Sequence, residues 1–261
     1  MDSSQLTITY IGGPTALLDF NGVRLVTDPT FDPAGGQYPS GAAVLRKLMG
    51  PAIGADQIGR VDGVLLSHHH HHDNLDHAGH AFLSQAKTVF TTPEGAQQLG
   101  GNSVGLKMWE SRDVNTPSGK RLRMVATPAR HGPANMDRGP VCGFVFFFTD
   151  APERAAYFSG DTVWYEGVAE VAKRYPIRAA LLNLGAARVA EVGPFHLTMT
   201  SKEGVEAASA FPDAAIIPLH FEGWAHFSEG RDKIAEAFTA AKMLNRLTWP
   251  QAGRAVTVSL S

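Results

Sequence analysis

The chain has 261 residues, 44% of them hydrophobic and 18% charged, and its formal net charge at pH 7 is −2. These are the proportions of an ordinary globular protein, and the nearly balanced charge gives no electrostatic basis for binding nucleic acid or an anionic membrane. The first residues show no secretory signal, and no apolar run approaches the ~20 residues needed to cross a bilayer. We therefore expect a cytoplasmic protein, and a homo-oligomer is compatible with the sequence.

The first sixty residues divide into a patterned part and an irregular part. Strands are predicted at 6–11, 15–20 and 23–27, separated by Gly12-Gly13-Pro14 and Asn21-Gly22, which predicts an antiparallel meander at the edge of a sheet. Between residues 30 and 60 we predict only a short helix at 42–49. A connection of this length is usually functional, so we interpret it as a wall or lid over a site.

The rest of the chain alternates strands and helices. Strands are predicted at 61–66, 87–91, 121–126, 141–149, 155–158, 179–184, 215–219 and 255–260. Helices are predicted at 78–86, 93–100, 163–174, 201–211 and 232–244, with Thr92 and Thr200 as N-caps. Because no linker or composition shift divides the sequence, we expect a single domain over residues 1–261, with two packed sheets and helices on their outer faces.

Five consecutive histidines, residues 68–72, directly follow the apolar segment 61–66, and Asp73-Asn74-Leu75-Asp76-His77 comes next. An affinity tag also contains consecutive histidines, but it sits at a terminus or beside a flexible linker. A histidine-rich metal-storage tract is the other alternative, which the rest of the chain disfavours. Imidazoles and carboxylates at the end of a buried strand are typical of a transition-metal site on a rigid support.

Three more predicted strands lead into residues of metal-ligand type, namely His131, Asp161 and His220. Strand ends that converge at one edge of a sheet are a usual place for a site. Neutral imidazoles and carboxylates suit Zn²⁺, Mn²⁺ or iron. The one cysteine, Cys142, excludes a thiolate-based zinc finger and lies in an apolar run, which predicts a buried, inert thiol.

This ordered set of motifs resembles the metallo-β-lactamase superfamily. The segment Leu65–Asp76 resembles its first motif, His-x-His-x-Asp-His, and the segments around His131, Asp161 and His220 resemble its later metal histidine, bridging aspartate and last metal histidine. The opening segment 15–28 is similar to the first hairpin of the ascorbate-6-phosphate lactonase-like branch. The resemblance implies an α+β fold, the four-layer αβ/βα sandwich, with one or two ions of Zn²⁺ or Mn²⁺ per chain.

The histidine run allows three registers of the first motif. They are His69-x-His71-x-Asp73-Asn74, His68-x-His70-x-His72-Asp73 and His68-x-x-His71-x-Asp73. The first puts Asn74 where the motif has its final histidine, the second exchanges acid and imidazole, and the third resembles a variant branch ending Asp-Asn-Leu-Asp. Because an amide binds a borderline metal more weakly than imidazole does, Asn74 leaves the second metal position in question.

The resemblance also implies roles for these residues. The first metal would be held by His71, His131 and one of His68 or His69; the second would be held by Asp73 and His220, with Asp161 bridging. Asp73 is a candidate to take a proton from the attacking water, and Asp76 is a candidate to orient a ligating imidazole. His196 and His226 lie in predicted loops. Each could line the substrate pocket or be simply a polar loop residue, and in the pocket His196 would be a catalytic acid.

The implied activity is that of a metal-dependent hydrolase, in which a metal-bound hydroxide attacks a small ester, lactone or phosphoester. Two alternatives remain. One is a phosphodiesterase on the same scaffold, and the other is a non-catalytic metal-binding or sensing protein, which the replacement of the motif's last histidine by Asn74 would permit.

Overall fold

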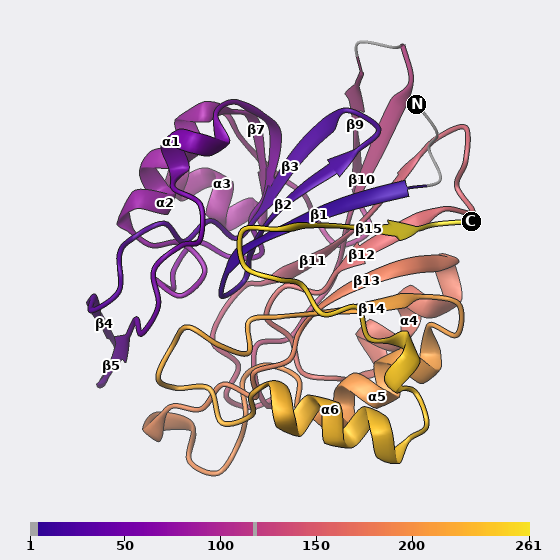
Figure 1. Ribbon diagram of the computed structural model, residues 1–261. Coiled ribbons are helices and arrows are strands. Elements are labelled where there is room, and N and C mark those ends of the chain that lie inside the picture. The colour runs from indigo at the N-terminus through magenta and orange to yellow at the C-terminus, as the bar shows by residue number, and fades with distance from the viewer. Residues whose placement is uncertain (1–4, 117–118) are drawn as a thin grey trace.

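The computed structural model describes residues 5–116 and 119–261, and its main feature is a pair of β-sheets lying face to face (Figure 1). The strands of the first sheet are β1 (Gln5–Gly12), β2 (Thr15–Phe20), β3 (Val23–Thr27), β6 (Val61–Leu65), β7 (Ala86–Thr91), β8 (Ser103–Gly105) and β15 (Ala255–Ser259). Those of the second are β9 (Ser111–Asn115), β10 (Arg121–Pro128), β11 (Cys142–Phe148), β12 (Ala155–Phe158), β13 (Ile177–Asn183) and β14 (Ala215–Leu219). The spatial orders are β15-β1-β2-β3-β6-β7-β8 and β14-β13-β12-β11-β10-β9.

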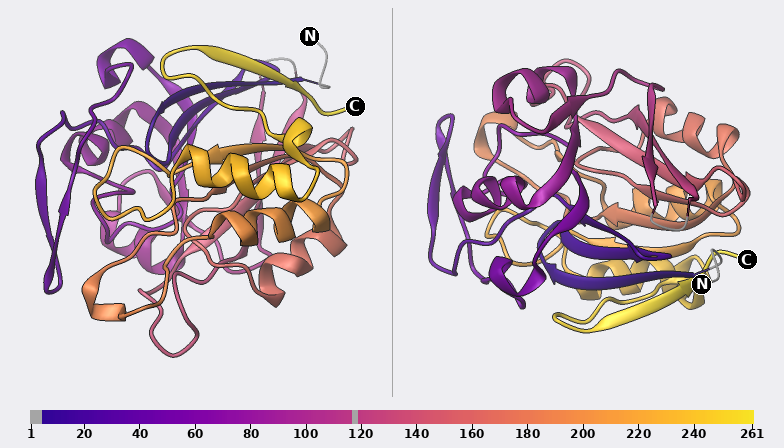
Figure 2. Two further views of the ribbon diagram at one scale, coloured as in Figure 1. Left: turned by 60° about the horizontal axis from the view of Figure 1, so that its bottom comes forward. Right: turned by 90° about the horizontal axis from the view of Figure 1, so that it is seen from above.

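Helices form the two outer layers. Beside the first sheet lie α1 (Ala55–Ile58), α2 (His77–Phe82) and α3 (Pro93–Leu99), and beside the second lie α4 (Glu166–Arg174), α5 (Ser201–Ala210) and α6 (Arg231–Ala240) (Figure 2). Short 3₁₀ turns are η1 (Leu83–Gln85), η2 (Ala190–Val192) and η3 (Leu244–Arg246). The order helix, sheet, sheet, helix confirms the predicted α+β, four-layer αβ/βα sandwich.

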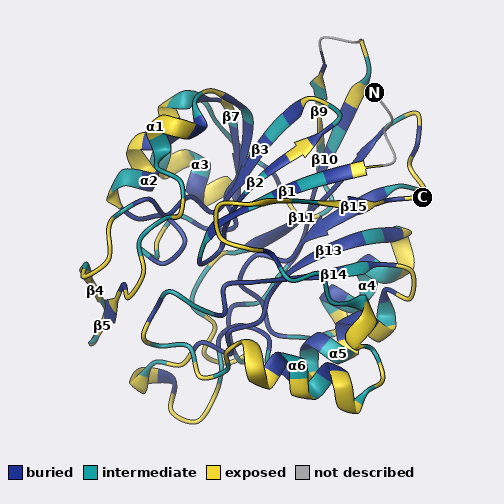
Figure 3. Cartoon of the chain, in the orientation of Figure 1, coloured by how far each residue is buried: buried dark blue, intermediate teal, exposed yellow. Residues whose placement is uncertain are grey.

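The hydrophobic core lies between the two sheets, and one further apolar layer lies beneath each set of helices. Figure 3 shows the strands largely buried and the outward faces of the helices exposed. In the central layer Phe20 of the first sheet packs edge-on against Phe148 of the second, with ring centroids 4.7 Å apart. Cys142 is buried at the start of β11, as the sequence predicts. Within the described ranges, no helix is both long and apolar enough to span a membrane.

Two predictions for the N-terminal part are wrong. Residues 42–49 do not form a helix, because β4 (Gln37–Ser40) and β5 (Ala43–Arg46) pair as an antiparallel hairpin that projects from the body of the molecule (Figure 1). The opening meander does not lie at a sheet edge, because the C-terminal β15 pairs antiparallel with β1 and takes the outer position.

The directions of the strands determine where the loops that carry the predicted metal-ligand residues meet. β12, β13 and β14 are parallel neighbours, and β10 runs in the same direction because both β10 and β12 are antiparallel to β11. In the first sheet β3, β6 and β7 are likewise parallel. The carboxyl ends of parallel strands meet at one edge of a sheet, which is where the polar loops following β6, β10, β12 and β14 gather.

Candidate metal centre

Three histidine rings from two loops face one another at the carboxyl ends of β6 and β10. The Nδ1 atom of His71 lies 3.0 Å from His68 Nε2 and 3.2 Å from His131 Nε2. Burial is the largest cause that lowers the pKa of His68 well below its ordinary value and the pKa of His71 to about 3. Both rings are therefore neutral near pH 7, which is the form that binds a metal.

Hydrogen bonds behind two of these rings determine which nitrogen carries the proton. His131 Nδ1 lies 3.0 Å from the carbonyl oxygen of Leu197, so Nδ1 donates and, in the neutral ring that binds a metal, Nε2 carries the lone pair. Ser67 Oγ donates to Asp28 Oδ2 at 2.7 Å and therefore accepts from His68 Nδ1 at 2.9 Å. This leaves the Nε2 lone pairs of both rings directed toward the third imidazole, an arrangement that a shared cation stabilises.

A second group of ligand-type atoms adjoins the first. Asp161 Oδ1 lies 2.9 Å from His220 Nδ1 and accepts a hydrogen bond from Asn183 Nδ2 at 2.7 Å. The other oxygen, Asp161 Oδ2, is 3.7 Å from His131 Nε2. The other ring nitrogen of His220, Nε2, is 3.7 Å from Asp73 Oδ2. Asp161 therefore faces both groups, as a bridging carboxylate would.

The two buried carboxylates are ionised. Burial opposes this, but the hydrogen bond and charge of His226 hold the pKa of Asp73 well below its ordinary value. In the same way His220 outweighs burial and lowers the pKa of Asp161. The Asp161 charge in turn raises the pKa of His220 against its own burial. The centre thus holds both carboxylates in the ionised form, which is the form that binds a metal.

Donor atoms without partners support the same conclusion. Among the described residues, Asp73 Oδ1, Asp161 Oδ2 and His220 Nε2 are buried and have no hydrogen-bond partner. A buried polar atom without a partner costs free energy, and a buried unpaired charge costs more. Because these are imidazole and carboxylate donors at the meeting point of four strand ends, the residues present fit a divalent cation such as Zn²⁺ or Mn²⁺.

Backbone geometry next to the ligand-type residues is specialised. His220 has a positive φ of 53°, a conformation that is uncommon for a residue with a side chain, and its N–H donates to the Gly13 carbonyl oxygen at 2.8 Å. Gly160, directly before Asp161, has φ of 56°, and a Cβ there would lie only 2.6 Å from the Cys142 carbonyl oxygen. Only glycine allows this close approach of the two loops.

Two polar residues support the centre from behind, and the sequence analysis did not single them out. Asp28 follows β3, is fully buried, and accepts hydrogen bonds from Ser67 N, Ser67 Oγ and Asn74 Nδ2 at 2.6 to 2.8 Å. Asn183 is the last residue of β13 and orients Asp161. The sequence could have indicated both, because each stands at the carboxyl end of a parallel strand, as the predicted metal-ligand residues do.

Some predicted residues are not brought into the cluster. His69 is half-buried beside His70, with no contact to the facing imidazoles, and His196 forms an ion-pair contact of 2.8 Å with Glu203 at the start of α5. His70 does lie next to His68 and His71, with ring centroids 4.9 and 4.3 Å away, but it is exposed and its Nε2 lies 2.6 Å from the Arg138 carbonyl oxygen. The geometry therefore favours the register His68-x-x-His71-x-Asp73.

Asp76 does not orient an imidazole. It is the N-cap of α2, where its side chain accepts from Gly79 N, and it also accepts from the N–H groups of Phe31 and Asp32 and from Lys47 Nζ. Its function in the structure is to join the histidine-rich loop to the segment that carries the β4–β5 hairpin.

A small pocket open to solvent lies over the cluster. Its floor includes His71, Asp73 and His131. The walls come from the hairpin, from the loop after β10, from the loops around η2 and from the loop after β14; they are formed by Ser40, Leu45, Arg138, Ala187, Val189, Leu197 and His226. The predicted wall between residues 30 and 60 therefore has its counterpart in the hairpin residues Ser40 and Leu45.

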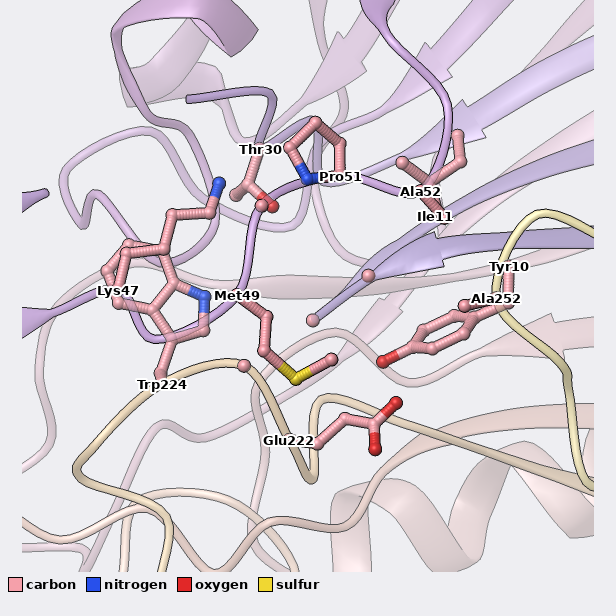
Figure 4. A pocket seen from close by; sticks show the side chains of 14 residues that line it. Tyr10, Ile11, Thr30, Lys47, Met49, Pro51, Ala52, Glu222, Trp224 and Ala252 are labelled. Carbon is pink, nitrogen blue, oxygen red and sulfur yellow. The ribbon is translucent and has the colours of Figure 1, made fainter. Parts of the chain in front are cut away.

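A second, larger cavity of about 180 Å³ is also bordered by the loop after β14. Figure 4 shows the ring of Tyr10, the side chain of Met49 and the indole of Trp224 around it, with Glu222 at its lower side. The segment after the hairpin is joined to this loop beside the cavity, since Leu48 N and Met49 N both donate to the Gly223 carbonyl oxygen. The ligand-type side chains of the metal centre do not line it.

Comparison with known families agrees with this geometry. A family model described as the beta-lactamase superfamily domain matches residues 23–221, well over half of the chain and all of the strand ends described above. The chain belongs to the metallo-β-lactamase superfamily. The superfamily that the order of motifs indicated is thereby confirmed.

Relatives from several bacteria share modest sequence identity with this superfamily member. The chain is 23% identical to the UPF0173 protein YddR of Bacillus subtilis, over 97% of the chain and 100% of that protein. It is 27% identical to an uncharacterised protein of Mycobacterium bovis over 84% of the chain, and the matched part spans only 59% of that relative. A Myxococcus xanthus relative named UPF0173 metal-dependent hydrolase is 28% identical over 64% of the chain and 58% of the relative.

Solved structures show the same fold. An isothiocyanate hydrolase from Delia radicum gut bacteria superposes with a TM-score of 0.82 at 23% identity, covering 97% of this chain and 99% of that one. A possible metal-dependent hydrolase from Veillonella parvula gives a TM-score of 0.81 at 20% identity, covering 98% and 99%. At these identities the likeness concerns the fold.

Proposed function

We propose that this protein is a metal-dependent hydrolase that acts on a small ester, lactone or phosphoester, with Zn²⁺ or Mn²⁺ as its cofactor. The main support is that His71, Asp73 and His131 line a pocket open to solvent. A structural metal site is closed by four protein ligands, whereas a catalytic site keeps a position for water or substrate. The names of relatives, which include metal-dependent hydrolases, agree with this proposal.

The chain's own residues have separate parts in this proposal. His68, His71 and His131 would hold one ion, and Asp73 and His220 a second, with Asp161 between them. A bound divalent ion supplies acidification of water and polarisation of the bond to be cleaved. Asp73 Oδ1, which is buried without a hydrogen-bond partner, is the atom available to orient that water and accept its proton.

The pocket walls suggest the kind of substrate. Leu45, Val189 and Leu197 offer apolar contact, while Arg138 is the cationic side chain that lines the pocket. Such a mixture suits a small organic molecule with one polar or anionic end. An ester or lactone uses the apolar walls fully, and Arg138 specifically favours the second candidate, a phosphodiester, because guanidinium binds phosphate oxygens well.

The test is turnover of generic lactone, ester and phosphodiester substrates, measured side by side on protein loaded with Zn²⁺ or Mn²⁺. The proposal expects hydrolysis of at least one class that is abolished by a chelator and restored by the metal. Arg138→Ala should lower phosphodiester turnover much more than lactone turnover if the phosphodiesterase candidate holds. Tight metal binding without turnover of any class would instead support a non-catalytic metal-binding or sensing protein.

A further inference from the structure

Asn74 stands where the superfamily's first motif has its last histidine, and its side chain is engaged elsewhere. Its Nδ2 donates to Asp28 Oδ2 at 2.8 Å and lies 3.4 Å from Ser67 Oγ. Those atoms belong to the support behind His68. The position beside Asp73 and His220 therefore lacks the imidazole that the usual motif would supply.

A histidine from a distant part of the chain lies beside Asp73 instead. His226 Nε2 is 3.0 Å from Asp73 Oδ2, the same oxygen that lies 3.7 Å from His220 Nε2. The His226 side chain is 10% exposed and lines the pocket over the cluster together with His71. Its other ring nitrogen, Nδ1, is buried without a hydrogen-bond partner among the described residues.

The loop that carries His226 is fixed on both sides. Ala225 N donates to the Arg46 carbonyl oxygen, and Arg188 N donates to the His226 carbonyl oxygen at 2.9 Å. The ring of Phe227 packs against His226 and also against His220, each at a centroid distance of 4.7 Å. Trp224 of the same loop lies beside Lys47 of the hairpin segment (Figure 4). His226 is thus held in place rather than free to swing into solvent.

We propose that His226 is a ligand of the second metal ion, taking the place left by Asn74 and completing a set with Asp73, Asp161 and His220. This inference rests on the proposed metal-dependent function. Borderline divalent ions prefer imidazole to an amide oxygen, so recruiting His226 restores a donor set that the sequence motif alone lacks. The second position is then occupied despite the altered motif.

The experiment compares His226→Ala with the native protein and with His80→Ala, an exposed histidine on α2 outside the cluster. Each protein is stripped, titrated with Co²⁺, and followed by ion stoichiometry and by the visible d–d absorption. The native protein and His80→Ala should bind two ions per chain. His226→Ala should keep the tighter ion and bind the other more than ~100-fold more weakly, beyond the 10–100-fold loss typical of an outer-sphere partner. The absorption of the second ion should also change.

The possible results separate the two claims. Native protein that binds no ion overturns the proposed function. Native protein that binds a single ion leaves the function standing and overturns the role of His226. The same holds if His226→Ala binds the second ion with unchanged absorption, because His226 would then act only through its hydrogen bond to Asp73. Circular dichroism of each variant checks folding, and His226→Gln, which keeps volume but not the imidazole, should repeat the loss if alanine disturbs the loop.

Discussion

Replacing Lys47 by methionine tests how the hairpin is attached to the metal centre. Lys47 Nζ lies 2.7 Å from Asp76 Oδ2, and the two side chains are 3% and 0% exposed. Removing one partner of a buried ion pair leaves an uncompensated charge and typically costs about 3–5 kcal/mol. Asp76 retains three backbone N–H donors, so we expect the lower end, about 3 kcal/mol, and a fall in Tm of about 6–12 °C.

The assay is urea unfolding with linear extrapolation, for single and double variants. Lys47→Met should cost at least about 2 kcal/mol less in the background of Asp76→Asn, because no buried charge is then left alone. The matched control is Lys87→Met. Lys87 pairs with Asp62 at 2.6 Å but is 61% exposed, so its loss should cost no more than about 1 kcal/mol. Equal costs for Lys47→Met in both backgrounds would refute the reasoning.

Three further outcomes are expected. His131→Ala should lose bound metal and activity while keeping its circular dichroism spectrum; undiminished metal content after gel filtration would show that this ring is not a ligand. Burial would raise the pKa of Glu203, but the hydrogen bond with His196 outweighs burial and lowers it. The stability that this carboxylate contributes is therefore present above its ordinary pKa and is lost as the pH falls through the lower pKa of the folded state. Glu203→Gln should therefore flatten the acid limb of a stability–pH profile, and an unchanged limb would contradict this. Gly79→Ala should cost about 3 kcal/mol or more in urea unfolding, since a Cβ there collides with the Pro29 carbonyl oxygen; a cost below about 1 kcal/mol would exclude the collision.

The sequence predicted the strand ends well because their signals are local. β14 was predicted with its observed bounds, and Thr92 and Thr200 both cap helices as expected. The hairpin of β4 and β5 was mistaken for a helix. The residues of 42–49 have good intrinsic helix propensity, but pairing within the hairpin and the hydrogen bond from Ala225 N to Arg46 override that preference.

Within the site, the sequence predicted which types of residue would gather, but not which histidines of the run 68–72 would face the others. Five adjacent imidazoles are equivalent in a local pattern, and only the fold shows that His68 is buried on Ser67 while His69 turns aside. The role of His226 was left open for a related reason. It lies 153 residues from Asp73 in the sequence, and no local motif connects the two residues. The relation to the lactonase-like branch and the single-domain organisation stay predictions.

The ligand-type residues are divided between the two halves of the sandwich. His68, His71 and Asp73 follow a strand of the first sheet, whereas His131, Asp161 and His220 follow strands of the second. An ion held by both would join the two sheets, which otherwise meet mainly through apolar contact. Because the binding energy of such an ion stabilises the folded state alone, removing the ion with a chelator should weaken the association of the two sheets as well as stop turnover.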